Sequence, residues 1–223
     1  MLEFLHFNMC GLESSYVFDS EVSELSDRKH KKLTSTLQYA SRCWAKHLFQ
    51  VVPAENDTND LLLCFNKFMS DKLIFWIEAM NLIDAVFECS ALLKDAQDWL
   101  NKVRNTFPIM EENFISMAFQ GKQQPDLMQY LEDAANFCTF FSGSPAAKST
   151  PYLYISALST WYQKLPVWTQ WKHWFTCIPL ISLKHTITVP LLTMKTNGKI
   201  NCIALSGNDD QIISGSLDHL VHV

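Results

Sequence analysis

The chain has 223 residues, of which 48% are hydrophobic and 18% are charged, and its formal net charge is -5. This composition provides ample apolar surface for a buried core and excludes an intrinsically disordered chain. The only basic cluster, Arg28 to Lys32, is too small to indicate a nucleic-acid partner.

The cysteines and the N-terminus bear on the compartment. Seven cysteines, an odd number, lie far apart without a C-x-x-C pair, so the sequence predicts neither a disulfide framework nor a zinc site. The N-terminus carries Glu3 where a signal peptide would be basic. No run of roughly 18 apolar residues, the length of a membrane span, exists. The stretch from Leu165 to Leu183 comes closest, and polar residues and two prolines interrupt it. We therefore expect a cytoplasmic protein with no transmembrane segment, no metal and no cofactor.

The first part of the chain predicts an irregular segment followed by a helix. Residues 1–34 suit an irregular N-terminal segment with one short amphipathic piece. Ser35 followed by Gln38 matches a capping box, in which each side chain binds the backbone amide of the other residue. Apolar residues then recur at helical spacing until Pro53. The polar run 55–60 predicts a loop.

The next stretch predicts several packed helices. We expect helices over 61–69, from about Ser70 onward, over a stripe between Leu92 and Val103, and over 109–119 beyond Pro108. The helix after Ser70 is apolar on all sides, which indicates burial among other helices. The residues that we assign to the helical core are Trp44, Trp76 and Trp99.

A further helix is expected to start at Pro125 and to stop at Gly143, followed by a short one over 152–158. Together, residues 35–160 are predicted to form a helical connector domain. Prolines and four tryptophans make 161–190 an expected aromatic linker. Its tryptophans favour packing against neighbouring elements, with a sugar or membrane-surface platform as the alternative.

From residue 191 the pattern changes to short strands separated by turns. The fold class predicted is mainly α: a multi-helix array with a short C-terminal antiparallel β-meander. This tail resembles a WD repeat in the order strand, turn, strand, Ser-Gly-Ser, Asp, strand. The resemblance makes 191–223 a single incomplete repeat, with Lys195-Thr196 at the position of the usual Gly-His and without the Trp-Asp. It assigns Ser214, Ser216 and Asp218 to the structural turn.

The upstream residues also resemble a known family. The stretches from Phe7 to Tyr16, Ser20 to Val22, Leu37 to Leu48, Lys72 to Glu78 and Tyr152 to Leu158 are similar to fungal NACHT–WD-repeat proteins of the STAND class, heterokaryon-incompatibility type. There, the matching region lies between the nucleotide-binding module and the propeller. The resemblance implies a non-catalytic scaffold segment with protein partners, and further WD blades in full-length relatives.

Chemical motifs give no competing function. The chain contains no G-x-x-x-x-G-K-[ST] loop for phosphate binding. Glu78, inside an apolar helix, suits either a general acid with a raised pKa or, as we favour, a structural partner of a lysine or backbone donor. Cys43 and His47 have the spacing of a nucleophile and base but no third group to orient the histidine. A cryptic hydrolase and a truncated or degenerate gene product remain the alternative functions.

Overall fold

The computed structural model describes residues 1–52, 55–106, 127–172, 174–175, 200–205, 212–216 and 221–222. The chain forms two compact units, Met1–Pro190 and Leu191–Val223. The described part is mainly helical, which confirms the mainly α part of the predicted class. The helix expected over 109–119, the helix start at Pro125 and the turn residue Asp218 lie outside the described residues.

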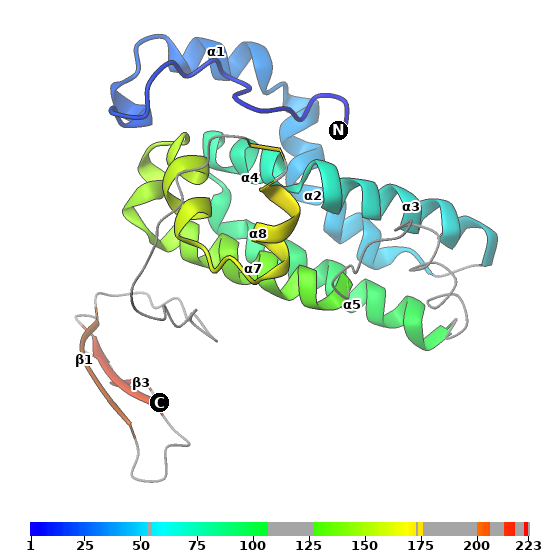
Figure 1. The fold of residues 1–223 in the computed structure, drawn as a ribbon. Coiled ribbons are helices and arrows are strands. Elements are labelled where there is room, and N and C mark those ends of the chain that lie inside the picture. Colours follow the sequence, from blue (N-terminus) through cyan, green and yellow to red (C-terminus); the bar gives the residue numbers. More distant parts are fainter. Residues whose placement is uncertain are drawn as a thin grey trace. The chain divides into compact units, whose positions relative to one another are not determined.

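The helical unit contains the following elements in chain order, of which Figure 1 labels the α-helices. They are the 3-10 turn η1 (Asp19–Glu21), α1 (Leu25–Lys32), α2 (Ser35–Gln50), α3 (Glu55–Asp71), α4 (Leu73–Leu82), η2 (Val86–Glu88), α5 (Cys89–Thr106), α7 (Leu127–Gly143), η3 (Pro145–Lys148), the π-helix η4 (Leu153–Leu158) and α8 (Pro166–Trp171).

Two helix starts differ from those expected. The N-cap of α2 is Thr34 instead of Ser35: its Oγ1 accepts from the Leu37 amide at 3.3 Å, and the Gln38 side chain donates to the Leu33 carbonyl. The predicted N-cap is therefore wrong by one residue, and Gln38 binds a carbonyl where the capping box would have it bind the N-cap amide. The predicted loop over 55–60 is also wrong, because α3 begins at Glu55. Acidic residues suit the first turn of a helix as well as they suit a loop.

Helix α4 lies at the centre of the core. All ten of its residues are buried, including the polar Glu78 and Asn81. It packs against α2 and α3, while α5 contacts both α2 and α7. Aromatic rings fill the space between these helices: Trp44 lies 5.7 Å from Trp76, and Phe65 lies 5.8 Å from Trp99 between ring centroids. Burial on every side explains why the sequence of α4 lacks a polar face.

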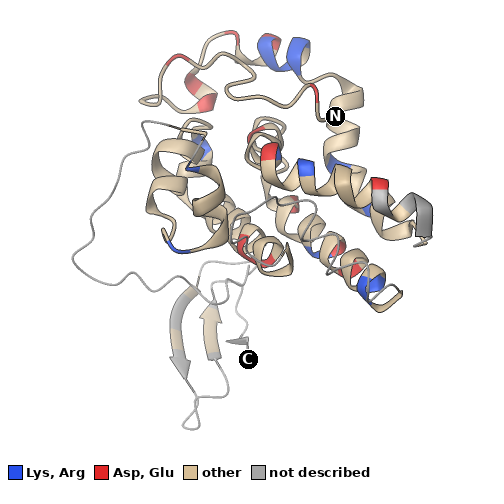
Figure 2. Ribbon diagram, turned by 45° about the vertical axis from the view of Figure 1, so that its right-hand side comes forward, with Lys and Arg blue, Asp and Glu red and all other residues tan. Residues whose placement is uncertain are grey.

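The helical unit continues past residue 160, where the sequence predicted a linker. Trp161, Val167 and Trp171 are buried, and α8 packs on α7. The favoured interpretation of the tryptophans as packing residues fits Trp161 and Trp171, whereas Trp174 is 51% exposed. The segment 1–34 is likewise more regular than expected, since it contains η1 and α1. The basic cluster lies on α1, whose Lys and Arg positions are blue in Figure 2. His30, Lys31 and Lys32 are exposed.

The second unit contains a three-stranded antiparallel sheet in the order β1 (Ile200–Leu205), β2 (Ile212–Ser216), β3 (Val221–His222). Leu205 pairs with Ile212, and a register irregularity falls between Ile200 and Cys202. Ser214 pairs with His222 in the second ladder. The described helices include none with the length and apolarity required to cross a bilayer.

Candidate functional site

Glu78 lies at the most unusual polar site of the helical unit. Its side chain projects from the fully buried α4, and the residue is 1% exposed. Oε1 accepts from the Met9 amide at 2.7 Å, and Oε2 accepts from the Asn8 amide at 3.0 Å. The Tyr154 hydroxyl also donates to Oε2. Both carboxylate oxygens are thus occupied by donors from two distant segments.

The backbone of the N-terminal segment is shaped to present these amides. Asn8 has a φ of 53°, in the left-handed region that asparagine adopts more readily than most residues. Its side chain holds this turn, because Oδ1 accepts from the Leu12 amide at 2.7 Å and Nδ2 donates to the Leu12 carbonyl. A left-handed residue directs successive N–H groups toward a common point, which suits an anion.

The environment of Glu78 acts on its pKa in two directions. Burial raises the pKa above its usual value, while the hydrogen bonds from Tyr154, Met9 and Asn8 lower it. Burial also raises the pKa of Tyr154 well above its usual value, and the negative charge of Glu78 adds to this effect. A general acid must reach the substrate atom to which it gives its proton. The contacts of Glu78 instead fix the path of the chain.

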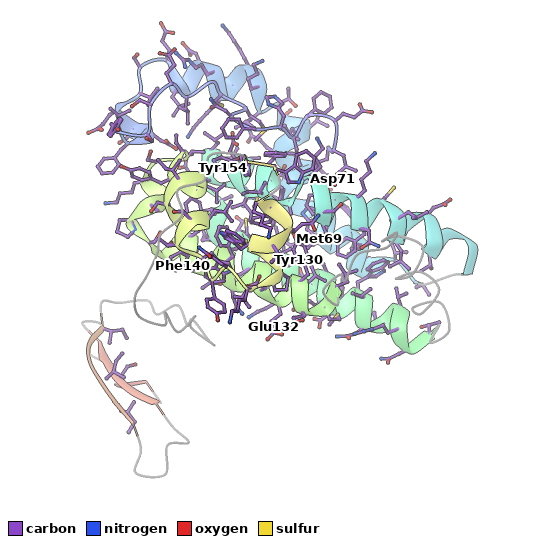
Figure 3. The ribbon with its side chains drawn as sticks, in the orientation of Figure 1. Met69, Asp71, Tyr130, Glu132, Phe140 and Tyr154 are labelled. Carbon is purple, nitrogen blue, oxygen red and sulfur yellow. The ribbon has the colours of Figure 1, made fainter. Side chains whose placement is uncertain are left out.

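Tyr154 brings a third segment to this site, and Figure 3 labels its position in the helical unit. Its ring lies 4.9 Å from that of Phe7 and 5.0 Å from that of Phe175, between centroids. Phe7 and Phe175 also contact each other, at 5.7 Å. Three rings from the N-terminal segment, from η4 and from the end of the described helical unit thus form one group.

Asp133 of α7 is a second buried carboxylate with the same kind of partners. It is 5% exposed; one oxygen accepts from Trp161 Nε1 at 3.0 Å and the other from the Val167 amide at 2.8 Å. Burial raises its pKa to about 6, against the opposing effect of these two donors. Val167 lies in the first turn of α8, whose amides have no partner within the helix. Asp133 therefore holds α8 against α7.

Asp19 makes a third contact of this type. Oδ1 accepts from the Thr150 amide at 2.9 Å, and Oδ2 accepts from the Thr150 hydroxyl. Asn81 of α4 donates to the same threonine Oγ1 at 2.9 Å. In all three places a carboxylate binds a backbone amide that is distant in the sequence. The N-terminal segment is held at both Asn8–Met9 and Asp19.

The residues assigned from the sequence are placed as follows. Trp76 and Trp99 are fully buried, and Trp44 is partly buried against the core. Ser214 and Ser216 lie on β2. His47 Nε2 lies 2.9 Å from the Tyr39 hydroxyl, so the ring of the proposed base is engaged there. Glu78 has the backbone donors that the sequence analysis favoured.

Sequence reasoning missed Asn8, Asp133 and Tyr154. Asp133 interrupts the apolar stripe of α7, which is the signal that identified Glu78 on α4. The part of the chain that the structure describes holds no group of three or more His, Cys, Asp or Glu side chains able to bind a metal ion. Comparison of the chain with family models, with curated proteins and with solved structures finds no match.

Proposed function

We propose that this chain is a non-catalytic connector, the helical scaffold segment of a WD-repeat signalling protein of the STAND type. The observation that supports this most is the use of its buried carboxylates. Glu78 and Asp133 are the acidic groups best buried for acid–base chemistry, and both bind backbone amides. They hold the N-terminal segment and α8 on one helical unit, which is what a segment placed between two modules requires.

The proposal extends to the small sheet, which we interpret as one incomplete WD repeat. Its strand order and antiparallel pairing suit three strands of a propeller blade. Ser214 and Ser216 lie on β2, in the positions of the Ser-Gly-Ser motif. A single blade leaves both faces and its edges open. We therefore expect partners to be proteins, including further blades.

The genomic sequence on both sides of this reading frame tests the connector proposal. A Walker motif upstream and further WD repeats downstream are the expected result. Recombinant proteins encoded by those flanks should then bind this chain in analytical ultracentrifugation, and the chain itself should not hydrolyse ATP. Flanks with neither module would contradict the proposal and favour a degenerate gene product.

A hydrolase in the helical unit is the alternative from another functional class. A screen of purified protein against ester, amide and phosphate substrates addresses it, with Cys43→Ala and Glu78→Gln as the informative variants. Turnover that either variant abolishes while its circular dichroism spectrum is unchanged would overturn the non-catalytic proposal. Equal background rates in all three proteins are expected.

A further inference from the structure

Four side chains from four parts of the helical unit meet at one place, which we name the Tyr154 junction. They are Phe7 of the N-terminal segment, Glu78 of α4, Tyr154 of η4 and Phe175, which follows α8. The N-terminal segment here means residues 1–12, and the exit segment means Trp174–Phe175.

The N-terminal segment and the exit segment are linked through the rings of Phe7, Tyr154 and Phe175. Phe7 contacts Tyr154 and Phe175, so removal of its side chain takes away two of the three contacts in the group. Phe7 is 53% exposed, and Trp174 is 51% exposed. Leu5, Met9 and Cys10 of the N-terminal segment are nevertheless buried in the core, and Phe175 packs against it. The ring contacts hold the exit segment together with the Trp174–Phe75 contact at 6.4 Å and the hydrogen bond from the Trp174 amide to the Trp171 carbonyl.

The hydroxyl of Tyr154 ties the rings to the amides of the N-terminal segment. It donates to Glu78 Oε2, the oxygen that also accepts from the Asn8 amide. A movement of Tyr154 therefore changes the ring contacts and the carboxylate that holds Asn8 and Met9. A displacement of this side chain therefore alters both sets of contacts together.

The backbone at Tyr154 has an uncommon geometry. Residues Leu153–Leu158 form a π-helix, a conformation that is rare and is often found at functional sites. A π-helical turn holds about one residue more than an α-helical turn, and one residue corresponds to about 100° of rotation. A change of this segment to α-helix would therefore reorient the Tyr154 ring in one discrete step.

We propose that the Tyr154 junction couples the N-terminal segment to the exit segment, so that release of either one releases the other. This inference deepens the proposed function, on which its biological meaning rests, because it names the place where a connector passes a change from one end to the other. The coupling between the two segments requires no partner protein and can be measured on this chain. A partner that binds the N-terminal segment would thereby alter the contacts of Trp174 and Phe175.

Hydrogen exchange of the whole chain, followed by mass spectrometry, tests the coupling. Phe7→Ala should speed exchange of peptides that contain Trp174 and Phe175 by ~10-fold, since two ring contacts are lost. Phe175→Ala should speed exchange of the Asn8 and Met9 amides to a similar degree. Phe4→Ala is the matched control, because Phe4 lies in the same segment, is 64% exposed and makes no ring contact with the described residues.

A second variant separates coupling from a general loss of stability. Tyr154→Phe keeps the ring and removes the bond to Glu78; we expect faster exchange in both segments and unchanged exchange in α5. The double variant Phe7→Ala/Phe175→Ala should exceed neither single variant by much, as contacts in one group are not additive. The coupling is overturned if Phe7→Ala acts on the exit segment no more than Phe4→Ala, or if Tyr154→Phe affects neither segment. That result would leave the connector proposal standing, because its test depends on the flanking modules.

Discussion

Asp133 and Trp161 form a buried hydrogen bond of 3.0 Å between the carboxylate and the indole Nε1, 28 residues apart in the chain. The second oxygen of Asp133 accepts from the Val167 amide. One side chain of α7 thus holds both sides of the turn that leads into α8. Because burial raises the pKa of Asp133 to about 6 from 3.8, the strength of this arrangement depends on pH.

Replacement of Asp133 by asparagine should remove one specific pH dependence. The folded protein binds a proton at Asp133 more tightly than the unfolded chain does, so this group stabilises the fold fully below the unfolded pKa of 3.8 and loses that contribution as pH rises through about 6. The free energy of unfolding of the wild type, minus that of Asp133→Asn, should fall by about 3 kcal/mol between about pH 4 and pH 7. Urea titrations at several pH values measure it.

Glu132→Gln provides the matched control for that measurement. Glu132 is the exposed neighbour of Asp133 on α7, labelled in Figure 3. Its replacement should leave a pH profile close to that of the wild type. A difference profile that is flat for Asp133→Asn, or that rises with pH, would contradict the role assigned to burial.

Loss of the Glu78 carboxylate should release the N-terminal segment. In Glu78→Ala the amides of Asn8 and Met9 and the Tyr154 hydroxyl lose their acceptor, and we expect a loss of ~3 kcal/mol in unfolding free energy. Limited proteolysis should cut within residues 1–12 sooner than in the wild type. Glu21→Ala, at an exposed site where only the Phe18 amide is bound, should change neither result. Unchanged proteolysis of Glu78→Ala would show that the segment is held by other contacts.

The left-handed conformation of Asn8 should make glycine more stable than alanine at this position. Asn8→Ala and Asn8→Gly both remove the bonds to Leu12, but only alanine meets a steric penalty at a φ of 53°. Asn8→Ala should therefore be less stable than Asn8→Gly by about 1 kcal/mol. Thermal unfolding followed by circular dichroism compares the two. Equal stabilities would mean that this turn relaxes to another conformation.

The central tryptophan should matter far more than an exposed one. Trp76 is fully buried and donates through Nε1 to the Ser41 carbonyl at 2.9 Å. Trp76→Ala should cost about 4 kcal/mol, whereas Trp174→Ala, at a 51% exposed site, should cost about 0.5 kcal/mol. Urea denaturation measured by circular dichroism gives both values. Similar losses for the two variants would place the core elsewhere.

The cysteines should differ in reactivity. Cys89 and Cys138 are both fully buried, and burial raises the pKa of the Cys89 thiol well above its usual value, with the neighbouring Cys138 adding to the effect. Cys64 is exposed. Alkylation of the native protein with iodoacetamide, followed by peptide mass spectrometry, should label Cys64 first and the buried pair only after denaturant is added. Early labelling of Cys89 would show that α5 and α7 separate readily.

The sequence indicated the helices of this unit well where an apolar stripe was long. The stripe from Leu92 to Val103 lies within α5, and Gly143 ends α7 as predicted. The sequence predictions were wrong where they depended on local polar residues, at the starts of α2 and α3. Thr34 and Ser35 are adjacent hydroxyl residues, either of which can cap a helix, and tertiary packing decides between them. The WD-repeat and STAND resemblance stays a prediction.

Of the candidate site, the sequence predicted the carboxylate but not its partners. Glu78 is visible in the sequence because a carboxylate stands out in an apolar helix. Its partners are not visible, because Asn8 and Met9 bind through their backbone amides from about 70 residues away. A backbone donor leaves no trace in residue type. The short helix expected over 152–158 contains Tyr154, but its residue types do not distinguish a π-helix from an α-helix and do not indicate Glu78 as the partner of the hydroxyl.

The backbone amides bound by Glu78 and Asp133 also bear on how this sequence can vary over evolution. Every residue except proline carries an N–H, so an apolar substitution of similar size at Met9 or Val167 keeps the donor, while proline at either position removes it. The acceptors, in contrast, are the side-chain carboxylates of Glu78 and Asp133, and most substitutions at these two positions remove them. Natural variants of this chain should therefore accumulate changes on the donor side of each pair well before they change either carboxylate.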